Sequence, residues 1–311
     1  MSSHDHQHSP GADRRWLGAA LLVIVAFMVG EVIAGLLAHS LALLTDAAHM
    51  LTDAGALAVA IIASRIVQRP ARGAFTYGFA RVDALSGQAS GITLMLLAVW
   101  FAIEGVRRLF APVGVHGGAV TVVALIGVAV NVIATMFAGR ADRGSLNVRG
   151  VIAHLITDLW AFAATVVAGL VVLTTGWTRA DSIASLVVAA VMAWTGWRLV
   201  HASGRVFLEA APFGVDPVEL GEELAQTDGV AEVHDLHVWE IGPGTVALSA
   251  HVLVRPPRDC HEVAAALRTA LRERHGIGHV TLQTDHADAA DQHGAADCAD
   301  AHGVVHTPHT R

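Results

Sequence analysis

The sequence predicts an α-helical membrane domain of six transmembrane helices followed by a small two-layer α+β domain. Three observations carry this prediction. Hydrophobic residues make up 54% of the 311-residue chain and charged residues only 15%, against about 25% charged in an average soluble protein. Six apolar segments follow one another up to residue 200, and the composition becomes that of a soluble domain from Arg205 onward.

Each of the six apolar segments is long enough to cross about 30 Å of hydrocarbon as a helix. The first two are joined by almost nothing, which predicts a tight helical hairpin. The predicted helices are Trp16–Ala38, Ser40–Ala63, Ala84–Val106, Ala119–Phe137, Gly150–Leu173 and Ala180–Val200.

Arginine is unevenly distributed between the two ends of these segments, with 11 on one side and 3 on the other. Because positively charged residues favour the cytoplasmic side, both chain termini are expected in the cytoplasm and the protein in the plasma or inner membrane. The 11 arginines are Arg14, Arg15, Arg65, Arg69, Arg72, Arg81, Arg140, Arg143, Arg149, Arg198 and Arg205.

The soluble part alternates between helical and strand-like patterns in the order α-β-β-α-β, which favours two packed layers. A turn at Gly242–Gly244 joins the first two strands into a hairpin. The expected elements are Pro217–Thr227, Val230–Ile241, Thr245–Val254, Cys260–His275 and Ile277–Gln283. The predicted limits are a membrane domain at 15–204 and a cytoplasmic domain at 205–286.

Both ends of the chain are rich in histidine and lack periodicity, so residues 1–14 and 287–311 are predicted to be disordered tails. The tail histidines either capture zinc loosely or are simply solvated. Cys260 and Cys298 form no paired framework, and free thiols in a reducing compartment are the simplest interpretation. Nothing in the sequence predicts a nucleic-acid partner.

Two apolar segments each carry an H-x-x-x-D pair, His49 with Asp53 and His154 with Asp158. Residues four apart share one face of a helix. A charged residue in the bilayer costs about 2.5–3.5 kcal/mol even on lenient scales, so such residues face the bundle interior and find partners. If the two helix faces that carry these pairs face each other, they supply two imidazoles and two carboxylates, a complete ligand set for Zn²⁺. The plainer alternative is two separate hydrogen-bonded pairs between helices, which leaves the matched spacing unexplained.

The charges of this ligand set predict competition between metal and protons. Two carboxylates and two neutral imidazoles sum to −2, which Zn²⁺ neutralises and which protons must otherwise offset. A site of this kind that faces each side of the membrane in turn is an antiporter.

Four further polar residues lie in the apolar segments. Asp46 is a candidate entry or proton-relay residue. Glu31 and Asn131 either line a water path or support the metal ligands, with plain interhelical hydrogen bonding as the equal alternative. Asp181 is expected to act as a negative charge at the start of its own helix.

Several longer motifs resemble the cation diffusion facilitator family of zinc transporters, over roughly residues 15–286. The motifs are Ser40–Asp53 (SLALLTDAAHMLTD), Tyr77–Leu85 (YGFARVDAL), Leu146–Gly150 (LNVRG) leading to His154 and Asp158, and Val233–Trp239 (VHDLHVW). The resemblance implies a homodimer of six-helix protomers with a cytoplasmic ferredoxin-like domain, exporting metal against protons by alternating access. The presence of histidine in both H-x-x-x-D pairs, at His49 and His154, resembles the zinc-preferring branch of the family.

The resemblance also implies cytoplasmic metal binding at His234, His251, His261 and Asp285, where Zn²⁺ would act as a structural or regulatory ion. Gln283 replaces a further family histidine, so a single site, or a weaker pair completed by His286, Cys260 or water, is expected. Surface histidines at a dimer interface are the alternative. His237 and Trp239 are expected to belong to packing.

This chain departs from the family in three ways. The loop between the fourth and fifth helices has no histidine. The loop at Ser64–Val82 has no histidine, cysteine or acidic residue, so no metal site is expected there. The family's W-x-x-x-D-P motif lacks its proline at Trp177–Ser182.

A charge contact between Arg81 and Glu209 is expected at the cytoplasmic membrane edge. Two other classes of function are kept beside the exporter. An intramembrane zinc protease would need a catalytic glutamate, as in H-E-x-x-H, and no such pattern occurs. In a membrane metal sensor without transport, zinc binding would change the dimer geometry of the cytoplasmic domain.

Overall fold

A computed structural model describes residues 10–67, 70–138, 146–242, 244–287 and 304–308. Within them, the side chains of residues 10–21, 53, 56–65, 67, 137–138 and 146–157 lie outside the description. Residues 1–9 of the predicted N-terminal tail (1–14) lie outside the described residues. The backbone of the first helix begins at Pro10, inside the predicted tail.

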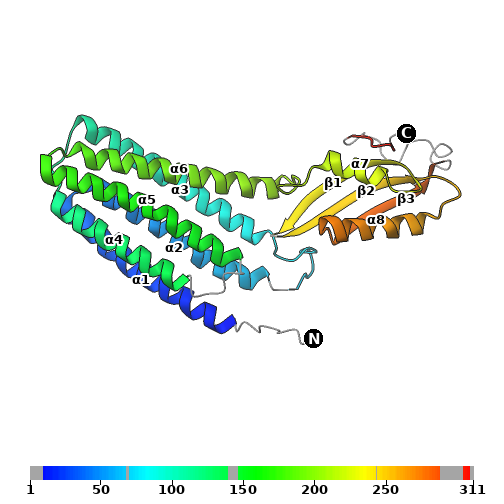
Figure 1. Ribbon diagram of the computed structural model, residues 1–311, viewed down its shortest axis with the longest axis horizontal. Coiled ribbons are helices and arrows are strands. Elements are labelled where there is room, and N and C mark those ends of the chain that lie inside the picture. Colours follow the sequence, from blue (N-terminus) through cyan, green and yellow to red (C-terminus); the bar gives the residue numbers. More distant parts are fainter. Residues whose placement is uncertain (1–9, 68–69, 139–145, 243, 288–303, 309–311) are drawn as a thin grey trace, which may run out of the picture. The chain divides into compact units, whose positions relative to one another are not determined.

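The six predicted apolar helices are all present and lie alongside one another (Figure 1). Among the described residues, four helices are long and apolar enough to cross a membrane, namely α3 to α6. The apolar parts of α1 and α2 that are described, Leu22–Ala38 and Leu41–Thr52, are shorter. The full helices are α1 (Pro10–Ala38), α2 (Leu41–Val67), α3 (Val82–Phe110), α4 (Gly117–Ala138), α5 (Leu146–Thr175) and α6 (Arg179–Phe207).

The hairpin between α1 and α2 turns at His39, which has a left-handed backbone conformation (φ 55°). The Ser40 amide donates to the Gly35 carbonyl at 3.0 Å, so the last turn of α1 is closed by a backbone hydrogen bond. Two residues suffice for this connection, as the sequence predicts.

Glycine permits close helix contacts in the membrane part. A Cβ added to Gly91 in α3 would lie 2.8 Å from the carbonyl oxygen of Gly196 in α6, and the reverse holds for Gly196. Small residues let helix backbones approach closely where lipid supplies no hydrophobic drive for association. The α3–α6 contact therefore depends on both glycines.

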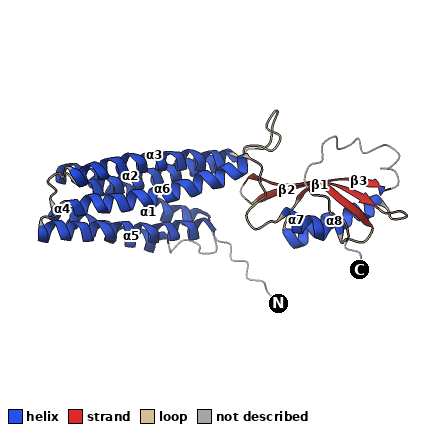
Figure 2. Ribbon diagram, turned by 90° about the horizontal axis from the view of Figure 1, so that it is seen from above, coloured by secondary structure: helices blue, strands red, loops and turns tan. Residues whose placement is uncertain are grey.

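The soluble part has the predicted order of elements and a three-stranded sheet (Figure 2). Strand β1 pairs antiparallel with β2, and β2 pairs parallel with β3, in the spatial order β1-β2-β3. Asp216 and Asp259 cap the two helices by accepting backbone N–H bonds. The elements are α7 (Pro217–Ala225), β1 (Val230–Gly242), β2 (Thr245–Val254), α8 (Cys260–His275) and β3 (His279–His286).

One face of this sheet is packed against α7 and α8, and the other, called the open face below, has no helix packed on it among the elements that the structure describes. Leu220 and Leu224 of α7 and Leu267 and Leu271 of α8 are buried together with alternate residues of the strands. On β2 the buried set is Leu248, Ala250, Val252 and Val254. The intervening residues of β2, among them His251, therefore lie on the open face.

The C-terminal segment departs from the prediction of a disordered tail from residue 287. His306 forms an antiparallel bridge with Val233 of β1, and its side chain is 5% exposed. Sequence periodicity could not reveal this pairing, because a single bridge needs only one residue opposite a free strand edge. The other histidines of this tail, His293, His302 and His309, fall outside the described residues.

The chain divides into two compact units. One contains residues up to Ile61 and Ala89–Val200, and the other contains Ile62–Gln88 together with His201 onward. The adjoining ends of α2 and α3 thus group with the soluble part.

Candidate metal-transport site

His49 of α2 and Asp158 of α5 meet inside the helix bundle. His49 Nε2 lies 3.4 Å from Asp158 Oδ1, and the two residues are 3% and 8% exposed. An ionisable pair removed from both water and lipid is costly unless its members interact. The structure therefore places one member of each H-x-x-x-D pair at a common point.

Asp53 and His154 occupy backbone positions one turn away from this contact. Their side chains lie outside the described residues. Helices α2 and α5 run in opposite directions, because the start of α2 lies at the start of α6 and α5 ends at Thr175, just before α6. Asp53 follows His49 by four residues on α2, and His154 precedes Asp158 by four residues on α5. Because the two helices are antiparallel, the backbones of Asp53 and His154 therefore lie on the same side of the His49–Asp158 contact along the bundle.

No group of three histidine, cysteine, aspartate or glutamate side chains within the described part of the chain lies close enough to hold a metal ion. Two of the four predicted intramembrane ligands have side chains outside that part.

Two further carboxylates are buried inside the helix bundle. Glu31 of α1 is 0% exposed and Asp46 of α2 is 1% exposed, and the two side chains interact with each other. Asn131 of α4 is also buried, and its backbone carbonyl accepts a hydrogen bond from Thr135 Oγ1 at 2.8 Å. The bundle thus encloses acidic groups beyond the two H-x-x-x-D pairs.

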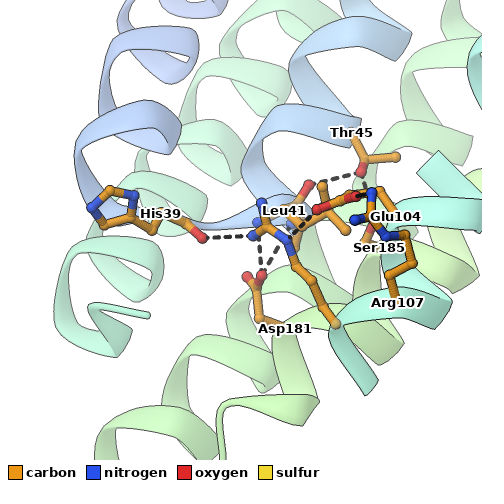
Figure 3. A network of polar contacts seen from close by, with 9 residues as sticks. His39, Leu41, Thr45, Glu104, Arg107, Asp181 and Ser185 are labelled. Atoms are coloured by element: carbon orange, nitrogen blue, oxygen red, sulfur yellow. Dashed lines mark hydrogen bonds and ion pairs between the residues drawn. The ribbon is translucent and has the colours of Figure 1, made fainter. Parts of the chain in front are cut away.

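Asp181 lies in the first turn of α6, as predicted, and its side chain also caps helix α2 (Figure 3). Its carboxylate accepts hydrogen bonds from Ser40 Oγ at 2.5 Å, Leu41 N at 2.7 Å and Ala42 N at 3.4 Å. The first N–H groups of a helix have no partner within the helix, and Asp181 supplies one from α6. The sequence shows the position of Asp181 at the start of α6, but no local pattern shows its contact with the first amides of α2.

A second polar contact joins α2 to α6 one turn further along. Thr45 Oγ1 lies 2.6 Å from Ser185 Oγ and also donates to the Leu41 carbonyl at 2.7 Å. Arg108 of α3 donates to the carbonyl of His39 in the adjoining turn at 2.9 Å. The start of the helix that carries His49 is therefore fixed by side chains from α3 and α6 (Figure 3).

On the soluble domain, three of the four predicted cytoplasmic ligands share the open face of the sheet. His234 pairs with His251 across β1 and β2, with ring centroids 5.4 Å apart. Asp285 lies on β3 beside Gln283, which stands opposite His251. His261 lies in the first turn of α8. His234, His251 and Asp285 share one face of the sheet, but within the described residues they do not come close enough together to hold a metal ion.

A β-bulge adds Asp235 and His237 to this face and corrects the assignment of His237 to packing. The register of β1 shifts between His234 and His237, and Asp235 has a left-handed conformation (φ 51°). The Asp235 carboxylate lies 2.9 Å from His237 Nε2 and 3.8 Å from His251 Nε2. Strict alternation along a strand fails at a bulge, so the sequence of β1 alone does not show that His237 faces the same side as His251.

Cys260 and His286 meet on the opposite side of the sheet. Cys260 Sγ lies 3.5 Å from His286 Nε2. Burial, with the charges of Asp259 and Asp285, raises the pKa of the Cys260 thiol above its ordinary value. The thiol is therefore protonated at neutral pH, as an unreactive free cysteine is.

The expected contact between Arg81 and Glu209 is present. Arg81 Nη2 lies 2.7 Å from Glu209 Oε1. The two side chains are 37% and 59% exposed, so water screens the attraction between them.

We expect the exchange Arg81→Glu with Glu209→Arg to recover stability that either single change loses. Each single change places like charges at this contact, at a cost of about 0.2–1 kcal/mol. Thermal unfolding of the two single variants and the double variant measures the coupling. Strictly additive losses would show that the contact contributes nothing.

Comparisons with known proteins agree with this architecture. Residues 17–208 match the family described as the cation efflux transmembrane domain, and residues 215–287 match the cytoplasmic domain of cation efflux proteins. The chain is 33% identical over 304 residues to the metal cation efflux system protein CzcD of Cupriavidus metallidurans, covering 95% of each chain.

Two other relatives are similar to the same extent. One is the zinc transporter ZitB of Escherichia coli, 33% identical over 287 residues and covering 91% of each chain. The other is a cadmium, cobalt and zinc/H(+)-K(+) antiporter of Bacillus velezensis, 32% identical over 288 residues, covering 91% of this chain and 92% of that one. These relatives are transporters rather than enzymes. The chain belongs to the cation efflux, or cation diffusion facilitator, family of multi-pass membrane transporters.

Proposed function

We propose that this transporter is a proton-coupled Zn²⁺ antiporter that exports zinc from the cytoplasm by alternating access. Its metal site would consist of His49 and Asp53 of α2 with His154 and Asp158 of α5. The observation that carries this proposal is the contact between buried His49 and Asp158 at 3.4 Å. It joins the two helices that bear the matched H-x-x-x-D pairs.

Zinc is the metal that this donor set favours. Two imidazole nitrogens and two carboxylate oxygens make a four-coordinate site of the kind that Zn²⁺ prefers. The names of the relatives support the choice, since ZitB is a zinc transporter and the Bacillus protein carries cadmium, cobalt and zinc.

Protons are the ions that we expect this site to exchange for zinc. Without metal, two carboxylates in a low dielectric are unfavourable as a −2 cluster, so protons occupy the site in place of zinc. Glu31 and Asp46 extend the chain of buried acidic groups, and we assign them, with Asn131, to proton transfer or to support of the metal ligands. The printed name of the Bacillus relative includes H⁺ among the exchanged ions.

The arginine asymmetry supports a cytoplasmic location for both termini and the soluble domain, and the direction of transport is proposed on that basis. The cytoplasm is then the loading side. The match of residues 215–287 to the family's cytoplasmic domain, termed a dimer domain, supports a homodimer. Zinc at His234, His251, His261 and Asp285 would act there as a structural or regulatory ion.

The test of proton coupling is zinc uptake into proteoliposomes with an imposed pH gradient. Movement of one proton down one pH unit is worth about 1.4 kcal/mol, or about tenfold in zinc accumulation. We expect an acidic interior to drive at least this accumulation of external Zn²⁺ and a protonophore to abolish it. Uptake that is indifferent to the gradient would contradict the antiport proposal.

A further inference from the structure

The outer edge of β1 is occupied by the chain's own C-terminal segment. In the order β1-β2-β3, strand β1 has β2 on one side only. On the other side, the His306 amide donates to the Val233 carbonyl at 2.8 Å, and the Val233 amide donates to the His306 carbonyl at 2.9 Å. An unpaired strand edge is a template for an added strand, and residues 304–308 use it.

The His306 side chain is inserted while its neighbours are not. His306 is 5% exposed, whereas Val304 and Val305 are 57% and 55% exposed. The imidazole lies over Gly221 of α7, so closely that a Cβ added there would be 2.3 Å from its Nε2 and Cδ2 atoms. Glycine is unfavourable inside a helix, yet only glycine leaves room for this ring.

We propose that the edge of β1 and the slot at Gly221 form a peptide-docking site, filled by residues 304–308 with His306 as the anchor, and that Zn²⁺ binding to His306 releases the segment. Main-chain pairing at a sheet edge supplies affinity and a side-chain pocket supplies specificity in this mode of recognition. The choice of Zn²⁺ as the releasing ion rests on the proposed function.

Docking of the segment blocks zinc binding at the Nε2 atom of this imidazole. Zinc bonds a ring nitrogen at about 2.0–2.1 Å and needs further ligands around it. In the docked segment, Nε2 faces the backbone of α7 at Gly221, and the side chain is almost wholly covered. A zinc ion bound at Nε2 therefore requires the ring to leave the slot.

Hydrogen exchange of the full-length protein in detergent tests the docking. Gly221→Ala places a methyl group where the His306 ring lies. We expect exchange of the β1 peptide containing Val233 to rise at least about tenfold, because the Val233 amide loses its partner. Gly278→Ala is the matched control, since nothing lies within 4 Å of its added Cβ.

Deletion of residues 304–311 and the variant His306→Ala provide independent routes to the undocked state. Both should raise exchange at Val233 to the same extent as Gly221→Ala, even if the alanine alters α7 itself. Unchanged exchange in the deletion variant would overturn the docking site.

Adding ZnCl₂ to the wild-type protein tests the release. We expect zinc, and not MgCl₂, to raise exchange at Val233 toward the level of the deletion variant. His306→Phe keeps a ring for the slot but offers no metal ligand, so the zinc effect should vanish in it. An equal response to zinc in His306→Phe would overturn release through His306. Neither readout depends on transport, so failure here is distinguishable from failure of the proposed antiport.

Discussion

His49→Ala is expected to lower zinc flux in proteoliposomes at least about 100-fold. The change removes one of the four proposed ligands and leaves Asp158 buried without the imidazole that lies 3.4 Å away. Loss of a residue that only supports a metal ligand already costs about 10- to 100-fold in affinity or activity, so loss of a ligand should cost more. Asp158→Asn should behave similarly, because it removes the negative charge and keeps the side-chain size.

Protein stability separates loss of the site from loss of the fold in this experiment. Zinc at 100 times its Kd stabilises a folded protein by about 2.7 kcal/mol, so the melting temperature of the wild type should rise with zinc. His49→Ala should unfold cooperatively but with a smaller zinc-dependent rise, because only zinc bound in the soluble domain still stabilises it. His116→Ala, the same change at an exposed position, is the matched control and should transport and respond as the wild type does. Normal flux in His49→Ala would show that the transport site lies elsewhere.

Asp181→Ala is expected to destabilise the membrane domain by about 2–5 kcal/mol. The change strands two buried amides at the start of α2, each costing about 1–3 kcal/mol without a partner. It also removes the acceptor of the Ser40 hydroxyl. Thermal unfolding in detergent measures the loss, and Asp181→Asn should recover part of it because the amide oxygen still accepts.

An exposed aspartate in the first turn of α3 provides the contrast for this prediction. Asp83 interacts only with the dipole of its own helix in the simplest interpretation, which is worth about 0.3–1 kcal/mol. Asp83→Ala should therefore cost far less than Asp181→Ala. Equal losses would mean that Asp181 is an ordinary first-turn charge, as its sequence position suggests, and that α2 is held by other contacts.

Helix α2 begins at the Asp181 contact and carries Asp46, His49 and Asp53 within its next few turns. A weakened start should therefore shift the proposed metal ligands relative to α5. We expect the Asp181→Asn variant to need more zinc for half-maximal flux, while the zinc-dependent stabilisation is retained at high zinc.

The sequence by itself determined the helical membrane domain, its six helices and the order of elements in the soluble domain. It did so because apolar length and strand alternation are local properties. It also selected His49 and Asp158, since a buried ionisable residue is expensive enough to stand out in an apolar segment. Family membership followed from motifs that are contiguous in the chain.

Only the tertiary structure decided which groups these residues meet. Asp181 caps a helix whose start lies 140 residues away in sequence, and no local signal distinguishes those amides from its own. The bulge at Asp235 turned His237 to the open face, because one extra residue reverses the alternation that the prediction assumed. Docking of His306 on β1 depends on a free strand edge and a missing side chain at Gly221, and those two features meet only once the chain has folded.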